Sequence, residues 1–148
     1  MNEFVSIEGM PTWAKLNKSE VTDWIVKVLE NSGFGLGELF FKFVSDSELL
    51  DYNRRFRQGD YYTDVLTFDE SVGMKLFGTV IISHQRVWEN AHEYDEDPNR
   101  EILRVMIHGV LHLMGVKDNE KEANTMRQKE EQALELFDVS RETIESKG

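Results

Sequence analysis

The chain is organised around residues 107–118, which read Ile-His-Gly-Val-Leu-His-Leu-Met-Gly-Val-Lys-Asp. His108 and His112 are four residues apart, so a helix would place both imidazoles on one face, one turn apart. Two imidazoles at this spacing can converge on one metal ion. Gly115 falls where a helix would end in a left-handed cap, after which the chain can turn and bring Asp118 towards the rings. Three such ligands with an open fourth position are typical of a catalytic metal site.

The residues around the histidine pair predict a buried helix. Asp97 and Pro98 are typical of a helix start, and residues 102–114 are almost entirely apolar. Gly109 lies in mid-helix at a cost of about 1 kcal/mol relative to alanine, so we expect another element to approach the backbone closely there. The two histidines could be core residues hydrogen-bonded to the backbone. Because two buried imidazoles both need partners, we favour a shared metal ion.

Two imidazoles and one carboxylate suit zinc, although iron or nickel would accept similar ligands. A water bound to such an ion loses a proton near neutral pH and becomes a hydrolytic nucleophile. Zinc peptidases carry their general-base glutamate directly after the first histidine. Here that position is Gly109, which makes a peptidase or amidase the second interpretation.

The composition indicates one globular domain over residues 1–148, because 40% of the residues are hydrophobic and the length suits a single core. Cysteine is absent, which excludes disulfides and cysteine-based metal sites. No signal-like or membrane-spanning segment is apparent, so we expect a cytoplasmic protein without membrane contact. The formal net charge of −11 argues against strong nonspecific binding to nucleic acid, and no DNA partner is expected.

Apolar periodicity and capping residues predict about four strands and about five helices, an α/β (α+β) pattern. The expected strands are residues 4–7, 39–44, 63–68 and 76–82, with the last two paired antiparallel. The expected helices are residues 17–31, 45–56, 83–94 and 97–114, with a last one that begins after Asp118 and runs to about Phe137. In the last helix, Ala123, Met126, Ala133, Leu134 and Phe137 are the candidate buried positions, and residues 142–148 are expected to be frayed.

Three arginines, Arg54, Arg55 and Arg57, cluster at the end of the predicted helix 45–56. Cations are stabilising near a helix C-terminus, which explains them without any ligand. In an acidic protein, they could equally bind an anion such as phosphate. The sequence leaves both interpretations open.

Residues 108–115 resemble the signature of the YbeY family of bacterial rRNA-maturation endoribonucleases, histidine-glycine-x-leucine-histidine-leucine-x-glycine, which continues with tyrosine-aspartate-histidine. Residues 53–57 match the family's asparagine-x-x-aromatic-arginine element, and residues 63–68 match its threonine-aspartate-valine-leucine-serine-phenylalanine strand. The resemblance covers most of residues 39–136. This chain departs from the pattern at Asp118, which stands where the third histidine ligand would be, and Thr79 replaces an aspartate.

The resemblance implies a zincin-like fold, with a small mixed sheet and the metal-binding helix packed on one side near the C-terminus. It also implies zinc-dependent, single-strand-specific cleavage of RNA in 16S rRNA 3′-end maturation and ribosome quality control. The expected partners are rRNA and the small ribosomal subunit. His108, His112 and Asp118 would hold one zinc ion, with Asn119 or Glu120 as substitutes for Asp118. Arg57 would contact the scissile phosphate, and Arg54 and Arg55 are candidate substrate-binding residues.

Two other functions stay open at this stage. One is a zincin-like metallohydrolase of another class, such as a peptidase or amidase. The other is a ribosome-assembly factor whose metal ion is purely structural.

Overall fold

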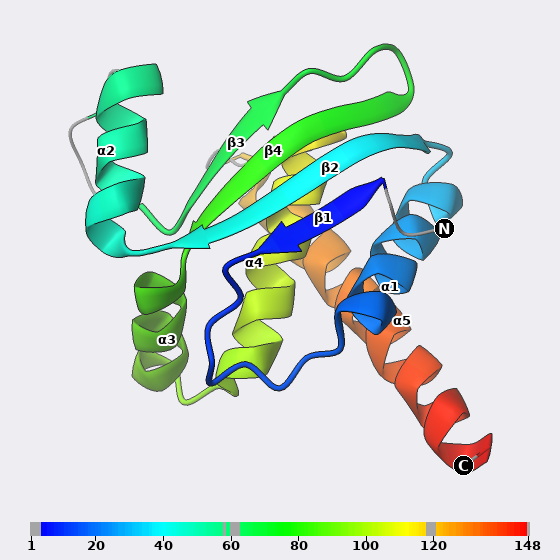
Figure 1. The fold of residues 1–148 in the computed structure, drawn as a ribbon. Coiled ribbons are helices and arrows are strands. Elements are labelled where there is room, and N and C mark those ends of the chain that lie inside the picture. Colours follow the sequence, from blue (N-terminus) through cyan, green and yellow to red (C-terminus); the bar gives the residue numbers. More distant parts are fainter. Residues whose placement is uncertain (1–3, 58, 60–62, 118–120, 148) are drawn as a thin grey trace.

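The computed structural model describes residues 4–57, 59, 63–117 and 121–147, with side chains as far as residue 139. This part of the chain forms the expected mixed α/β fold of four strands and five helices (Figure 1). None of the described helices is both long enough and apolar enough to cross a membrane. The strands are β1 (Val5–Glu8), β2 (Gly35–Val44), β3 (Val65–Asp69) and β4 (Lys75–Ser83). The helices are α1 (Lys18–Asn31), α2 (Asp46–Phe56), α3 (His84–Glu93), α4 (Pro98–Leu113) and α5 (Ala123–Lys147).

The strands form one mixed sheet in the order β1-β2-β4-β3. β1 pairs parallel with β2, and β2 pairs parallel with β4. β3 pairs antiparallel with β4, with Leu66 opposite Ile81, which confirms the pairing predicted for these two strands. β3 is therefore an edge strand of the sheet.

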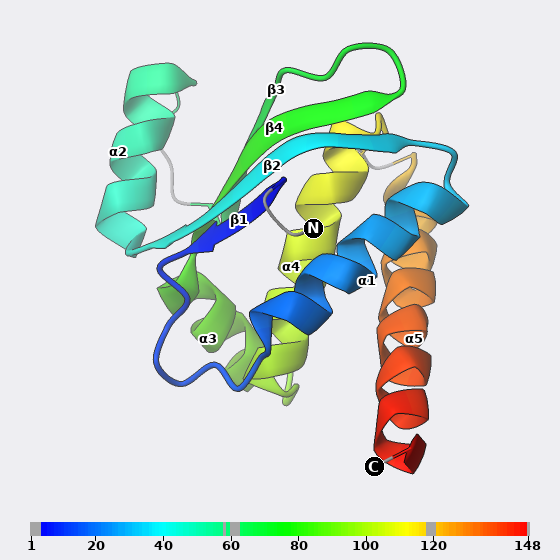
Figure 2. The ribbon, with the colours of Figure 1, turned by 45° about the vertical axis from the view of Figure 1, so that its right-hand side comes forward.

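Helices cover the two faces of the sheet unequally, as Figure 2 shows with α2 on one side and α1, α4 and α5 on the other. The larger core lies between the sheet and α1, α4 and α5. The smaller core consists of Val44, Leu49, Leu66 and Ile81, and Tyr52 and Phe68 pack against it beneath α2. Because side chains alternate along a strand, Val80 and Ile81 of β4 belong to different cores.

Four of the five predicted helix starts are confirmed by their caps. In each case a side-chain oxygen accepts a hydrogen bond from a backbone N–H of the first turn, which satisfies a donor that has no partner within the helix. The four capping residues are Asn17, Ser45, Ser83 and Asp97. Ser45 forms a full capping box with Glu48.

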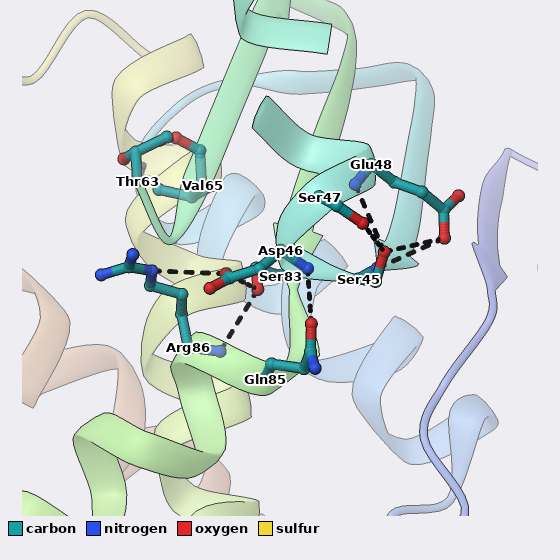
Figure 3. Close-up of polar contacts among 9 residues, drawn as sticks. All are labelled: Ser45, Asp46, Ser47, Glu48, Thr63, Val65, Ser83, Gln85 and Arg86. Atoms are coloured by element: carbon teal, nitrogen blue, oxygen red, sulfur yellow. Dashed lines mark hydrogen bonds and ion pairs between the residues drawn. The ribbon is translucent and has the colours of Figure 1, made fainter. Parts of the chain in front are cut away.

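The N-termini of α2 and α3 lie side by side because they follow two neighbouring parallel strands (Figure 3). The Asp46 carboxylate accepts hydrogen bonds from Ser83 Oγ at 2.6 Å and from Arg86 Nε at 3.3 Å. The backbone N–H of Asp46 donates to Gln85 Oε1 at 2.7 Å. These contacts fix the start of α2 and so determine where its last turn, with the arginines, lies over the sheet.

The larger differences from the predicted element boundaries are in β2, β3 and α5. β2 begins at Gly35 rather than at residue 39, because its pairing with β4 continues across an irregularity between Leu36 and Glu38. β3 begins at Val65 rather than at residue 63. α5 begins at Ala123 rather than directly after Asp118, and it continues past Phe137 to Lys147, so the backbone of residues 142–147 is helical where we expected it to be frayed.

Candidate functional site

The two histidines of the opening motif lie together on α4, as predicted. The His108 and His112 rings meet edge to face, with their centroids 4.7 Å apart. Both side chains are partly buried, whereas the apolar residues around them are fully buried. The helix ends as expected: Gly115 has a φ of +95°, and Val116 N–H donates to Leu111 O at 3.0 Å.

His108 is held by a carboxylate from α5. Its Nδ1 atom lies 2.6 Å from Glu130 Oε2, and the Glu130 side chain is only 7% exposed. An ionised carboxylate can only accept a hydrogen bond, so Nδ1 carries the proton and donates it to Glu130. In the neutral ring, Nε2 of His108 is then the nitrogen that carries a lone pair, as a metal ligand requires.

A buried charge network extends from Glu130 along α4. Arg104 Nη1 lies 3.3 Å from Glu130 Oε1, and Arg104 also binds both carboxylate oxygens of Glu101, at 2.6 and 2.8 Å. Glu101 and Glu130 are both buried, so each needs the arginine to offset its desolvation. The network fixes the position of Glu130 and, through it, the orientation of the His108 ring.

The ionisation of this network follows from its contacts. Burial alone would raise the pKa of Glu130, but the hydrogen bond from His108 and the charge of Arg104 outweigh it, so the pKa of Glu130 is lower than usual. The hydrogen bond with Glu101 raises the pKa of Arg104 although burial opposes this, so Arg104 is charged at any relevant pH. Glu130 is therefore an anion at neutral pH, as the assignment of the His108 proton requires.

This network lines a cavity of about 670 Å³ between α3, α4 and α5. Its wall includes His108, Arg104 and Glu130, together with Tyr94 of the turn after α3 and Arg127 of α5. His108 is therefore accessible from this polar cavity.

Gly109 explains how α4 packs so closely on the sheet. A Cβ atom at this position would lie 2.7 Å from Val80 Cγ1 and 3.1 Å from Val80 Cγ2, closer than side chains tolerate. The close approach that the sequence predicted therefore comes from β4. A longer side chain here would point into the sheet, so position 109 has no room for the general base of a peptidase.

The arginines lie on the other side of the sheet from the histidines. Phe68 of β3 contacts the guanidinium of Arg57, which lies 4.7 Å from the ring centroid. Its neighbour Thr67 faces the opposite way, towards Gly109 of α4. The structure therefore brings the two histidines together but separates them from Arg57 by the edge strand β3.

Arg54 and Arg55 occupy the last turn of α2, where cations favour the helix C-terminus. Arg55 Nε lies 3.1 Å from Asp51 Oδ2 in an exposed i,i+4 ion pair. Both arginines are exposed at the same end of α2 as Arg57. The helix C-terminus and the ion pair with Asp51 explain the position of Arg55 without any ligand. A phosphate-binding role for Arg54 and Arg55 stays a prediction.

The histidine pair offers two donors for the predicted metal site. Within the described ranges 4–57, 59, 63–117 and 121–147, no three His, Cys, Asp or Glu side chains gather closely enough to hold a metal ion. The predicted third ligand, Asp118, and its substitutes Asn119 and Glu120 lie outside the described residues. The donors present, an imidazole with its Nδ1 proton fixed by a carboxylate and a second imidazole beside it, fit a zinc-type site.

Sequence reasoning missed Glu130, although a signal for it exists. Met126, Ala133, Leu134 and Phe137 are buried as predicted, whereas Ala123 is exposed. Glu130 lies four residues after Met126 and so falls on this buried stripe of α5. A carboxylate on an apolar stripe needs a buried partner, and this one contacts His108.

The fold and the histidine pair define the class: a small mixed α/β domain that carries a candidate metal site on a buried helix. The family model described as endoribonuclease YbeY matches residues 9–138. The chain therefore belongs to the endoribonuclease YbeY family, as the resemblance implied.

Curated relatives agree with this membership, and a solved structure shares the fold. An endoribonuclease YbeY from Phocaeicola vulgatus is 39% identical over 125 residues, covering 84% of this chain and 91% of the relative. The endoribonuclease YbeY of Parabacteroides distasonis is 39% identical over 123 residues, covering 82% and 87%. A Thermotoga maritima protein solved in solution has a TM-score of 0.68 at 27% identity, covering 97% of this chain and 95% of its own.

Proposed function

We propose that this protein is a metal-dependent endoribonuclease that cleaves single-stranded RNA. Membership of a family whose curated members are named endoribonucleases supports a hydrolase acting on RNA. We further propose that its substrate is 16S rRNA at the 3′ end, presented by the small ribosomal subunit in the cytoplasm, where the enzyme also serves ribosome quality control. The single observation that carries the metal site is the buried Glu130 contact to His108 Nδ1.

His108, His112 and Asp118 would hold one zinc ion. The zinc ion would supply an activated water as the nucleophile and a positive charge beside the phosphate. Glu130 holds the proton on Nδ1 of His108, so that the ring keeps its orientation and presents Nε2. The fold would thus share with zincin-like enzymes a helix that presents two histidines one turn apart.

Arg57 would bind the phosphate backbone of the substrate. Its guanidinium carbon lies 4.7 Å from the Phe68 ring centroid, and in the described part of the chain no carboxylate forms an ion pair with Arg57. A planar guanidinium held in this way keeps its N–H groups available for phosphate oxygens. Because Arg57 lies across β3 from the histidines, we place it on the path of the RNA strand, with the scissile phosphate lying between it and α4. Arg54 and Arg55 would extend this cationic end of α2.

The peptidase alternative is disfavoured by Gly109. A peptidase places its glutamate base immediately after the first histidine. In this chain that position packs against Val80, and no carboxylate could lie there without moving β4.

The net charge of −11 fits a substrate that is delivered by a partner. If the ribosome presents its rRNA, the enzyme needs little affinity for free RNA. Filter binding tests this point, and tight, salt-resistant binding of the wild-type protein to free RNA would contradict it.

The proposed activity is tested by offering the purified protein a single-stranded RNA, the same RNA annealed to its complement, a single-stranded DNA and casein. Cleavage of the unpaired RNA alone is the expected result, and it should disappear in His112→Ala with folding retained. Hydrolysis of casein would favour the peptidase. Ribosome association that needs the metal ion, without any RNA cleavage, would favour an assembly factor with a structural metal.

A further inference from the structure

A continuous row of aromatic and cationic side chains lies beside the C-terminal end of α2. Lys42 Nζ lies 5.7 Å from the ring centroid of Tyr52 and donates a hydrogen bond to its hydroxyl at 3.1 Å. Tyr52 stacks on Phe56 with centroids 6.0 Å apart, and Phe56 meets Phe68 edge to face at 6.2 Å. Arg57 closes the row over Phe68. We call these five residues the aromatic–cation row.

Burial does not explain the centre of this row. Tyr52 and Phe68 pack against the smaller core, but the Phe56 side chain between them is 61% exposed. A single exposed phenylalanine is ordinary on a protein surface. Phe56 differs from that case because aromatic rings lie on either side of it and a cation lies at each end of the row.

The charges of the row select its ligand. The protein carries a formal net charge of −11, so a polyanion is repelled by most of the surface. Lys42 and Arg57 offset this locally, and the rings between them offer apolar faces. Aromatic rings flanked by cations are a pattern by which proteins bind single-stranded nucleic acid, since each base presents a flat π-face and each linkage a negative charge.

We propose that the aromatic–cation row is a binding site for unpaired bases of RNA, with a base stacked on Phe56 and the flanking phosphates on Lys42 and Arg57. The proposal rests on the RNA substrate proposed above and adds the place where that substrate is recognised. A duplex keeps its bases stacked on each other, so the row would bind single strands in preference to duplexes.

The position of the row relative to the histidines supports this role. The row lies on the α2 side of the sheet, and α4 lies on the other side, with edge strand β3 between them. Figure 2 shows α2 and α4 on opposite sides of the strands. An RNA strand that is stacked on Phe56 and passes over β3 would reach the histidine pair without crossing the body of the sheet.

The test compares the affinity of Phe56 variants for two RNA probes. The probes are a short oligoadenylate and an abasic RNA of the same length, which has the phosphates but no bases. All variants are made in the full chain with His112→Ala, so that the RNA stays intact during fluorescence-anisotropy titrations. Phe4→Ala is the matched control, because Phe4 is 47% exposed at the opposite edge of the sheet.

Phe56→Ala should weaken oligoadenylate binding roughly 5- to 100-fold, the usual loss for one stacked base, and leave abasic RNA unchanged. Phe56→Trp should restore binding, and Phe4→Ala should have no effect. Thermal unfolding of each variant shows that the fold is kept. The titrations are run in low-salt buffer, where even the weak affinity for free RNA expected above is at its strongest. Equal loss for both probes, no loss for either, or no binding by the parent protein under these conditions would overturn the proposal. Self-association that is abolished by Phe56→Ala would also overturn it and identify the row as a protein contact.

RNA cleavage by the same Phe56 variants, made with His112 intact, separates this proposal from the enzymatic one. If the wild-type protein cleaves RNA but Phe56→Ala binds oligoadenylate normally, the row is not the recognition site and the enzymatic proposal stands. If binding depends on Phe56 but no RNA is cleaved, the row is confirmed as an RNA-binding site and the enzymatic proposal fails.

Discussion

Replacing Gly109 by alanine tests how α4 is positioned on the sheet. Alanine is favoured over glycine in a helix by about 1 kcal/mol, so the substitution would stabilise a helix with free space beside it. Here the new Cβ would lie 2.7 Å from Val80 Cγ1 in a fully buried contact. Overpacking of this kind costs about 1–3 kcal/mol, and the β-branched valine has little rotamer freedom to move away. We therefore expect Gly109→Ala to lower the free energy of unfolding by about 1 kcal/mol.

Val80→Ala should reverse the sign of this effect. It removes both Cγ atoms, after which the nearest neighbour of the new Cβ is Thr67 Cγ2 at 3.5 Å, an ordinary contact. Val80→Ala alone should cost about 2 kcal/mol, because it deletes buried methyl groups and leaves a cavity. In that background Gly109→Ala should stabilise the protein by about 1 kcal/mol, which gives a coupling energy of about 2 kcal/mol between the two positions.

Urea unfolding of the wild-type protein, both single variants and the double variant measures this coupling. Gly115→Ala serves as the control, because Gly115 has a φ of +95° and nothing within 4 Å of its Cβ position. That substitution should cost about 1 kcal/mol with or without Val80, since its strain is in the backbone. If Gly109→Ala stabilises both backgrounds equally, the close packing of α4 on β4 is wrong.

Three further predictions concern the charges of the site. Glu130→Gln should lower zinc affinity about 10- to 100-fold in chelator competition, because His108 loses the carboxylate that fixes its ring. The matched control is Glu131→Gln, at the exposed neighbouring residue, which should leave zinc affinity unchanged. The pKa of Glu130 is lowered in the folded protein, so its contribution to stability is present above the ordinary glutamate pKa of 4.5 and is lost as the pH falls through and below that value. Urea midpoints of the metal-free protein should fall over this pH range. A Glu130→Gln protein with the same acid sensitivity would contradict this prediction. Arg57→Lys keeps the positive charge but loses the planar guanidinium over Phe68. RNA cleavage should therefore fall at least tenfold, while the free energy of unfolding changes by less than about 0.5 kcal/mol. Full cleavage activity in this variant would contradict a role for the guanidinium.

Most of the fold is predictable because its signals are local. The capping residues Asn17, Ser45, Ser83 and Asp97 mark helix starts through bonds to residues two or three positions away. The sequence prediction placed the start of β2 at residue 39, four residues too far along the chain, because residues 35–38 include two glycines. The strand conformation of these residues depends on their pairing with β4. The strand order β1-β2-β4-β3 likewise depends on long-range pairing, which no local pattern contains.

The candidate site likewise combines features that local sequence patterns predict with features that depend on long-range contacts. The placement of His108 and His112 on one helix face follows from periodicity, and the close approach at Gly109 follows from the cost of a glycine in mid-helix; both are confirmed. The contact of Glu130 with His108 joins residues 22 positions apart, and its local signal was only a carboxylate on an apolar stripe. The separation of Arg57 from the histidines depends on which face of the sheet α2 covers. Asp118 as a zinc ligand stays a prediction.

The central claim is that the histidine pair of α4 holds a metal ion that RNA cleavage requires. The most direct measurement is elemental analysis of the purified wild-type, His112→Ala and Asp118→Ala proteins, each assayed in parallel on a single-stranded RNA. We expect about one zinc ion per wild-type chain, and loss of both zinc and RNA cleavage in the two variants. Zinc content and RNA cleavage that persist unchanged in folded His112→Ala would contradict the claim.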